Sequence, residues 1–253
     1  MVNLKVNNLK KVYNKKVILN NISFEVNNGE FLSILGPSGC GKTTLLKILI
    51  GIEKPTSGEI IKNDLDITNL DSSKRGMGIV FQNYALFPNM TVLENVMYAL
   101  NLKLKNKELA KNESIKMVKM VNMEEHINKY PHQLSGGQQQ RVAIARTLAL
   151  KPDIILFDEP MSALDADNRL ILRKEIKKIQ SKFKTTMIYI THDQEEAFSL
   201  SDRVMVMRDG NIEQIDVPNK IYNKPANSYV RNFVTNHLKE KVSSIERCTG
   251  IDL

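Results

Sequence analysis

The chain has 253 residues, of which 42% are hydrophobic and 25% charged, and its apolar stretches are far shorter than the roughly 20 residues of a membrane-spanning helix. Its first residues include Lys and Asn where a secretory signal would be apolar, which argues against a signal peptide. The formal charge of +8 is scattered along the chain without the motifs of nucleic-acid-binding domains, so nucleic acid is not expected as a partner.

Apolar and polar residues alternate from residue 2 to about residue 30. This period of two predicts strands with one buried face, and Asn28-Gly29 has the composition of a hairpin turn, so we expect an antiparallel β layer. Tyr13 belongs to this layer. Its ring is either a stacking surface for a purine or a half-buried strand residue.

A phosphate-binding loop is predicted between an apolar strand at Phe31 to Leu35 and a helix at Thr44 to Ile50. The sequence GPSGCGKT matches the pattern G-x-x-x-x-G-K-[ST] without gaps, in the strand–loop–helix context that the pattern requires. Lys42 supplies a charge for the β and γ phosphates, and the Thr43 hydroxyl can complete the shell of Mg²⁺. A nucleoside triphosphate is the expected ligand, and alkylation of Cys40 inside the loop should block its binding.

The apolar strand at Met77 to Phe81 ends at Gln82. Ligands of parallel α/β sheets lie beyond the carboxyl ends of the strands, so the Gln82 amide is placed to reach Mg²⁺ or an attacking water.

The next region, residues 83–133, has a helical pattern. Thr91 and Glu94 form a capping box that predicts a helix through about Leu102, and a second helix is expected from Glu108 to Val121. Methionines concentrate here, either as an adaptable surface for a partner or as plain core filling. They are Met90, Met97, Met117, Met120 and Met123.

The sequence LSGGQ, residues 134–138, precedes a helix predicted from Gln139 to Leu150. Ser135 can cap that helix, and the two glycines expose N–H groups at its start, which makes a second phosphate-binding nest. One triphosphate already wrapped by the first loop leaves no use for this nest in the same site. We therefore expect it to face the nucleotide of a second copy, in a two-fold dimer.

Ile154 to Phe157 predicts a buried strand that ends in Asp158 and Glu159. The first carboxylate can hold Mg²⁺ through water, and the second can polarise an attacking water. The sequence SALD, ending at Asp165, leads into an amphipathic helix. Its apolar stripe is predicted to be core and consists of Leu172, Ile176, Ile179 and Phe183.

A further strand at Thr185 to Ile190 precedes His192. A single histidine is usually structural, but its place at a strand end, in line with the other polar strand ends, favours a role at the site. Arg203 to Met207 and Asn211 to Ile215 are expected to form a hairpin, and short helices are expected from Pro218 onward.

These motifs occur together and in one order: Tyr13, GPSGCGKT, Gln82, LSGGQ, IILFDE, SALD and His192. Over at least residues 2–235 the chain resembles the ATP-binding subunits of ABC transporters, and LSGGQ is the most specific element. Longer stretches such as THDQEEAFSLSDRVMVM resemble bacterial importers for polyamines, phosphonates, opines and ferric iron. That group often carries a further C-terminal β domain, whereas this sequence stops at Leu253, so we expect either a truncated chain or a short variant of the group.

The resemblance implies an α/β fold, with a RecA-like P-loop NTPase core, an antiparallel β layer and a helical insert. The core with the β layer would comprise residues 1–88 and 152–235, the helical subdomain 89–151, and a helical tail 236–253.

The resemblance also implies a role for each motif. Tyr13 would stack on adenine, Gln82 and Thr43 would ligate Mg²⁺, Glu159 would be the general base and His192 the γ-phosphate sensor. The phosphates would be held by Gly36, Pro37, Ser38, Gly39, Cys40, Gly41, Lys42, Thr43 and Thr44. The partner's ATP would meet Ser135, Gly136, Gly137 and Gln138, with Asp165 at the dimer seam.

The implied partners are a second copy across ATP, transmembrane permease subunits and, indirectly, an extracytoplasmic solute-binding protein. The groove after Gln82, including Tyr84 to Val92, would receive a coupling helix, which places the protein at the cytoplasmic face of the membrane as a peripheral subunit. One alternative is a soluble ABC ATPase of translation or DNA repair, although those usually have two modules or long coiled-coil insertions. The other is a P-loop kinase, in which LSGGQ would have no role.

Overall fold

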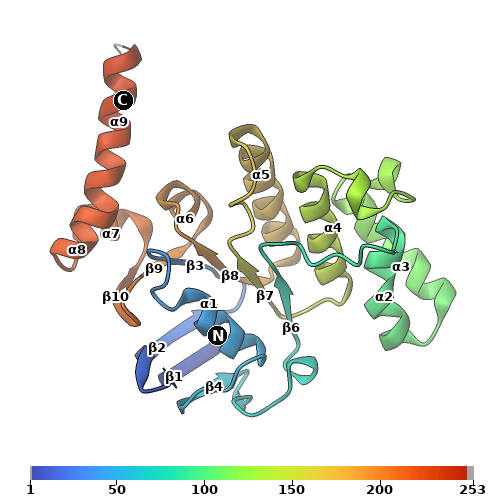
Figure 1. The fold of residues 1–253 in the computed structure, drawn as a ribbon, viewed down its shortest axis with the longest axis horizontal. Helices are drawn as coiled ribbons and strands as arrows, with labels where there is room; N and C mark the ends of the chain where they lie inside the picture. Colours follow the sequence, from blue (N-terminus) through green and yellow to red (C-terminus); the bar gives the residue numbers. More distant parts are fainter. Residues whose placement is uncertain (1, 250–253) are drawn as a thin grey trace. The chain divides into compact units, whose positions relative to one another are not determined.

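The computed structural model describes residues 2–249, and Figure 1 shows their helices and strands. The chain forms two compact units, one of Met1–Asp71 with Ile188–Leu253 and the other of Ser72–Met187. The end of the predicted helical tail, residues 250–253, lies outside the described residues. Within the described part, no helix is long and apolar enough to span a membrane.

The first unit contains the antiparallel layer that the alternating sequence predicts. Its strands are β1 (Val2–Tyr13), β2 (Lys16–Asn27), β4 (Ser57–Lys62) and β5 (Leu65–Asp66), in the order β2-β1-β4-β5. Inward-facing residues such as Leu4, Val6 and Ile22 are fully buried, so the period of two corresponds to one buried face.

The predicted position of the hairpin turn is wrong. Tyr13 pairs with Lys16, and the β1–β2 turn is Asn14-Lys15, where both residues have positive φ (45° and 66°). Two left-handed residues match the right-handed twist of the strands, although Asn-Gly is the commoner sequence there. Asn28-Gly29 does form a turn, but it leads from β2 to β3 (Phe31–Leu35), which does not pair with β2 and belongs to another sheet, where β9 is one of its neighbours.

β3 is buried along its whole length and pairs in parallel with β9 (Arg203–Arg208), which forms the predicted hairpin with β10 (Asn211–Asp216). After β3 the chain enters α1 (Lys42–Ile50). β8 (Thr186–Thr191) begins in the second unit and ends in the first, where α6 (Gln194–Leu200) follows it.

The C-terminal part of the first unit is helical, as predicted. It consists of α7 (Pro218–Asn223), α8 (Ser228–Val230), a π-helical turn at Arg231–Asn236 and α9 (His237–Thr249). Ile221, Val230 and Val234 pack on Leu35 and Val206 in one buried cluster. These helices therefore cover apolar residues of β3 and β9.

The second unit has two parallel strands, β6 (Met77–Val80) and β7 (Ile154–Asp158), paired from Met77 with Ile154 to Val80 with Phe157. Its long helices are α2 (Val92–Leu104), α3 (Lys107–Met120), α4 (Gly136–Ala149) and α5 (Ala166–Phe183). Single 3₁₀ turns lie at Ser72–Lys74, Glu124–His126 and Pro131–Gln133.

The predicted capping box is confirmed: Glu94 N–H donates to the Thr91 hydroxyl, and Thr91 N–H donates to the Glu94 carboxylate at 2.8 Å. α2, α3 and α4 pack against one another. Among the methionines of this region, Met117 and Met123 are buried and the other three are partly buried. The apolar stripe of α5 is core except for Phe183, which is 38% exposed because it stands at the last turn of the helix.

Candidate nucleotide-binding site

The phosphate loop of the first unit ends in a helix start that no side chain caps. The N-cap of α1 is Gly41, with φ 107°, and no side chain bonds to the first N–H groups of the helix. In an α-helix these N–H groups have no carbonyl partner one turn earlier, and the helix dipole adds positive charge beside them. The start of α1 is therefore suited to an anion.

Lys42 lies folded over this loop. Its Nζ donates to the carbonyls of Gly36 at 2.8 Å and Pro37 at 3.0 Å, and the residue is 4% exposed. Phosphate oxygens are stronger acceptors for an ammonium group than neutral carbonyls. Lys42 is thus held at the loop by contacts that a phosphate could replace.

Close packing determines the position of the loop. A Cβ on Gly36 would lie 2.5 Å from the Met207 carbonyl oxygen, and one on Gly41 would lie 2.9 Å from the Ile18 carbonyl oxygen. Cys40 is 3% exposed, and burial raises the pKa of its thiol. Strands β2 and β9 therefore hold the loop, and Cys40 points inward; the effect of its alkylation stays a prediction.

Tyr13 and His192 belong to the same unit as the loop. Tyr13 is 39% exposed at the end of β1, and its hydroxyl donates to the Glu53 carboxylate, which raises the pKa of Tyr13 to about 12. His192 is exposed just after β8, next to Asp193, whose carboxylate accepts the Glu195 N–H at 2.8 Å and so caps α6.

The second unit brings Gln82 close to Glu159. Glu159 directly follows Asp158, the last residue of β7, and has a left-handed backbone with φ 45°. Gln82 Nε2 donates to the Ser162 hydroxyl at 3.1 Å, and this hydroxyl donates to the Glu159 carbonyl at 2.9 Å. Backbone strain of this kind concentrates at functional sites. Ser162 is a residue that the sequence analysis missed, because a serine in SALD carries no signal of its partners.

Ser135 caps α4 as predicted, in a reciprocal capping box. Its hydroxyl accepts the Gln138 N–H at 3.4 Å, and its own N–H donates to the Gln138 side chain at 2.9 Å. Gln138 Nε2 also lies 2.9 Å from His126 Nε2. The side chains of Ser135 and Gln138 thus form hydrogen bonds within their own subunit.

The LSGGQ motif lies beside Asp165. Asp165 caps α5 by accepting the Asn168 N–H at 2.9 Å and its side-chain amide at 2.8 Å, bonds that lower the pKa of Asp165. A Cβ on Gly137 would lie 3.5 Å from Asn168 Oδ1. Asn168, which nothing in the sequence singled out, therefore connects these two predicted elements.

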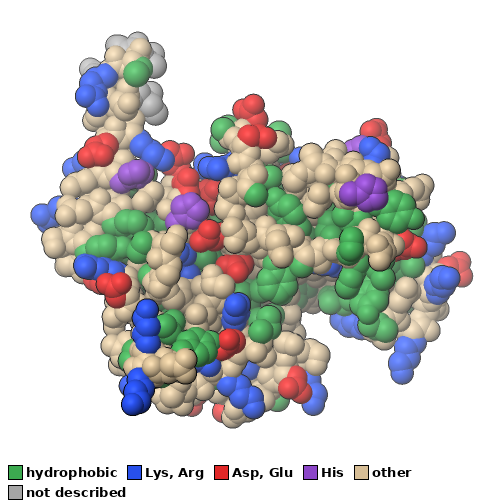
Figure 2. Space-filling model, viewed as in Figure 1, with side chains coloured by type: hydrophobic (Ala, Val, Ile, Leu, Met, Phe, Trp, Pro, Cys, Tyr) green, Lys and Arg blue, Asp and Glu red, His purple; other side chains and the backbone are tan. Residues whose placement is uncertain are grey.

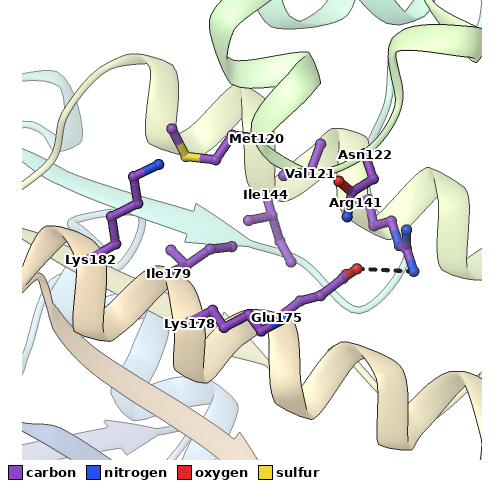
Figure 3. Close-up of a pocket in the computed structure, with 9 residues that line it drawn as sticks. All are labelled: Met120, Val121, Asn122, Arg141, Ile144, Glu175, Lys178, Ile179 and Lys182. Atoms are coloured by element: carbon purple, nitrogen blue, oxygen red, sulfur yellow. Dashed lines mark ion pairs between the residues drawn. The ribbon is translucent and has the colours of Figure 1, made fainter.

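Figure 3 shows a pocket of about 230 Å³ where α4 approaches α5. It contains none of the predicted site residues. At its edge Arg141 Nη2 of α4 lies 3.1 Å from Glu175 Oε1 of α5, and burial raises the pKa of Glu175. This ion pair joins α4, which begins within the LSGGQ motif, to α5, which begins directly after the SALD motif.

The predicted site residues divide between the units. Tyr13, residues 36–44 and His192 belong to the first, and Gln82, residues 135–138, Asp158, Glu159 and Asp165 to the second. Among the described residues, no group of three or more His, Cys, Asp or Glu side chains could hold a metal. On the face drawn in Figure 2, Lys and Arg side chains are interspersed with Asp and Glu.

Comparisons with known proteins identify the family. Residues 19–162 match the family described as ABC transporter. The chain is 47% identical over 252 residues to the Fe(3+) ions import ATP-binding protein FbpC of Fusobacterium nucleatum, covering 98% of this chain and 68% of that protein. It is 47% identical over 231 residues to the spermidine/putrescine import ATP-binding protein PotA of Mycoplasma capricolum, covering 91% of this chain and 66% of that protein. The chain thus spans about two thirds of the length of these relatives.

Solved structures agree with this assignment. MJ0796, a bacterial ABC transporter cassette with a dimeric structure, shares 36% sequence identity at a TM-score of 0.77, over 85% of this chain and 98% of that one. The cbiO1 protein of Clostridium perfringens, part of an ABC transporter complex, shares 29% identity at a TM-score of 0.82, over 99% of both chains. The predicted α/β P-loop NTPase fold is confirmed, and the chain belongs to the ABC transporter family.

Proposed function

We propose that the protein is the ATP-hydrolysing subunit of an ABC importer. The observation that carries this proposal is that Lys42 lies folded over the start of α1, which no side chain caps, because an ammonium beside the N–H groups of a helix start suits phosphate oxygens. The Thr43 hydroxyl, the Gln82 amide and the Asp158 carboxylate are the proposed Mg²⁺ ligands. They are oxygen donors of the kind that Mg²⁺ accepts together with substrate phosphates. When bound, Mg²⁺ would neutralise charge on the β and γ phosphates.

Glu159 is the proposed general base for the attacking water, and His192 the proposed γ-phosphate sensor. The bonds from Gln82 through Ser162 to the Glu159 carbonyl support this assignment, because they restrain the backbone on which the carboxylate stands. A restrained base needs less reorganisation when it accepts a proton from the water that attacks the γ-phosphate.

The LSGGQ motif is proposed to contact the ATP of a second copy. Its first helical residues, Gly136 and Gly137, present N–H groups at the start of α4, and Asp165 lies close by through Asn168. The dimeric structure of MJ0796 is in keeping with this arrangement. ATP would then favour the closed dimer by binding it more tightly than the separate subunits.

The loop after Gln82 is the proposed contact with transmembrane permease subunits. Phe87 and Tyr98 are 37% and 43% exposed, and their ring centroids lie 4.8 Å apart, as expected of an aromatic surface that receives an apolar segment. Arg146 of α4 donates to the carbonyls of Tyr84 at 3.0 Å and Ala85 at 2.7 Å. Movement of this loop would therefore reach the helix that begins at the LSGGQ motif.

The proposed solute is ferric iron or a polyamine, as the names of the similar importers suggest, with phosphonate as a further candidate. An extracytoplasmic solute-binding protein would deliver it to the permease. The subunit itself would act at the cytoplasmic face of the membrane.

The decisive test uses Glu159→Gln, which keeps the shape of the side chain and removes the base. Hydrolysis should fall by about 100-fold or more while ATP binding persists, and the variant should form a dimer with ATP that elutes earlier from a sizing column. Glu124→Gln, an exposed change in a 3₁₀ turn of the same unit, is the matched control. Unchanged turnover by Glu159→Gln would contradict the proposal.

A further inference from the structure

Tyr13 stands at the end of a strand pair that also touches the phosphate loop. Tyr13 pairs with Lys16 at the tip of the β1–β2 hairpin. Two residues further along β2, the Ile18 carbonyl oxygen lies 2.9 Å from where a Cβ on Gly41 would be. At a strand rise of about 3.3 Å per residue, the tip extends about 7 Å past this contact. Tyr13 therefore lies at a hairpin tip that extends past the contact with the phosphate loop.

Two charged side chains hold this ring. The Tyr13 hydroxyl donates to the Glu53 carboxylate, and Lys11 Nζ lies 3.0 Å from Glu53 Oε2. Lys11 Nζ also donates to the Lys54 carbonyl at 2.7 Å and lies 4.6 Å from the centre of the Tyr13 ring. The Lys11 and Glu53 side chains are only 13% and 29% exposed. The ammonium lies over one side of the ring, and Tyr13 as a whole is still 39% exposed, so the residue keeps surface that a planar ligand can contact.

Glu53 is in turn fixed to the helix that starts at the phosphate loop. Gly51, with φ 87°, ends α1 in the left-handed conformation and turns the chain back. The Glu53 N–H then donates to the Lys47 carbonyl, in the last turn of α1, at 3.1 Å. β1 is tied to the same segment, because the Val12 N–H donates to the Thr56 hydroxyl at 3.0 Å.

We propose that Lys11 and Glu53 are positioning residues that hold the Tyr13 ring for stacking against the base of the bound nucleotide. They connect the base end of the site to α1, and so to the loop that binds the phosphates. A ring held in place loses less rotamer freedom when the base stacks on it, which favours binding. The inference rests on the proposed function, because it requires that the protein binds ATP.

The test compares the affinity for MgATP of the full chain and its variants. Tyr13→Ala removes the stacking ring and should weaken binding by about 30-fold, within the range for base–aromatic stacking. Glu53→Ala keeps the ring but releases it, and should weaken binding by about 3- to 10-fold. Glu53→Gln keeps an acceptor for the hydroxyl and should restore part of the loss. The matched control is Glu25→Ala, which breaks the Lys5–Glu25 pair (2.8 Å) between the same strands.

Inorganic tripolyphosphate separates ring positioning from general damage to the loop. It has phosphates but no base, so Glu53→Ala should leave its affinity unchanged. A double-mutant cycle with Tyr13→Phe adds a second criterion. Removing the hydroxyl should weaken MgATP binding about as much as Glu53→Ala, and the two changes together should cost no more than either alone.

Three results would overturn the inference. The first is a MgATP affinity of Glu53→Ala equal to that of the unaltered chain, and the second is an affinity for tripolyphosphate that falls as much as that for MgATP. The third is a loss of MgATP affinity on adding Glu53→Ala to Tyr13→Phe that is as large as the loss from Glu53→Ala alone. The proposed function fails separately, if the unaltered chain does not bind MgATP at all. Unfolding midpoints of all variants confirm that each is folded.

Discussion

Two glycine-rich helix starts in this protein look alike in sequence and differ in structure. α1 begins after Gly41 without any side-chain cap, whereas α4 begins with Ser135 and Gln138 bonded to each other's backbone. The helix start after the first loop therefore has no side chain of its own in the place that suits an anion. At the start of α4, Ser135 and Gln138 already form hydrogen bonds with backbone N–H groups, so a bound phosphate would add fewer new hydrogen bonds there. This difference fits the proposal that the first loop binds the nucleotide and that the LSGGQ motif of a second copy contacts it only when the dimer forms.

The glycines of the two loops also differ in what surrounds them. Gly36 has no room for a side chain, because a Cβ would lie 2.5 Å from the Met207 carbonyl oxygen. Gly137 has room, since its nearest neighbour, Asn168 Oδ1, would lie 3.5 Å away. Tertiary packing thus sets the shape of the first loop, while the second owes its shape to its own cap.

The largest expected effect comes from the lysine of the first loop. Lys42→Ala should reduce the affinity for ATP by about 100-fold, because it removes a buried ammonium that would bind phosphate oxygens. Isothermal titration measures the affinity, and Lys47→Ala, an exposed lysine of the same helix, is the control. Equal affinity in Lys42→Ala and the unaltered chain would refute the assignment of this loop as the primary nucleotide site.

The glycines give the next largest contrast. Gly36→Ala should lower the free energy of unfolding by about 2 kcal/mol because the added methyl group meets backbone. Gly137→Ala should change it by less than about 0.5 kcal/mol, while weakening the ATP-dependent dimer of the Glu159→Gln protein. Urea unfolding and sizing chromatography measure the two quantities. The contrast in packing would be lost if both alanines destabilised the fold equally.

Ser162 tests whether the contacts within the second unit serve catalysis. Ser162→Ala breaks the link between Gln82 and the Glu159 carbonyl and should lower kcat by about tenfold. KM should change little, since Ser162 is not part of the proposed nucleotide-binding loops. Steady-state ATPase rates check this, with Ser181→Ala, an exposed serine on α5, as the control. A normal kcat would remove Ser162 from the mechanism.

The smallest effect distinguishes the serines of the two loops. Ser135→Ala should cost about 1 kcal/mol of stability because it deletes the cap of α4. Ser38 of the first loop is exposed and caps no helix. The free energy of unfolding of Ser38→Ala should therefore stay within about 0.5 kcal/mol of that of the unaltered chain. Thermal unfolding of the two variants, side by side, shows whether only the second loop depends on a side-chain cap.

Features that depend on neighbours in sequence were predictable. The strand and the helix that flank the loop of Lys42 follow from their hydrophobic pattern, and the capping box of Thr91 and Glu94 and the cap at Ser135 rest on bonds between residues three positions apart. Local hydrogen bonding and hydrophobic period are enough to specify them. The motifs of the site were readable for the same reason.

Tertiary structure alone decided the rest. The β1–β2 turn lies at Asn14-Lys15 because the register of the two strands follows their buried faces, and the local sequence pattern does not predict this register. Glu53 meets Tyr13 across 40 positions of sequence, and Ser162 meets Gln82 across 80. Such pairs depend on where whole strands and helices pack, so the sequence by itself determined which chemical groups the protein has, and packing decided which of them meet.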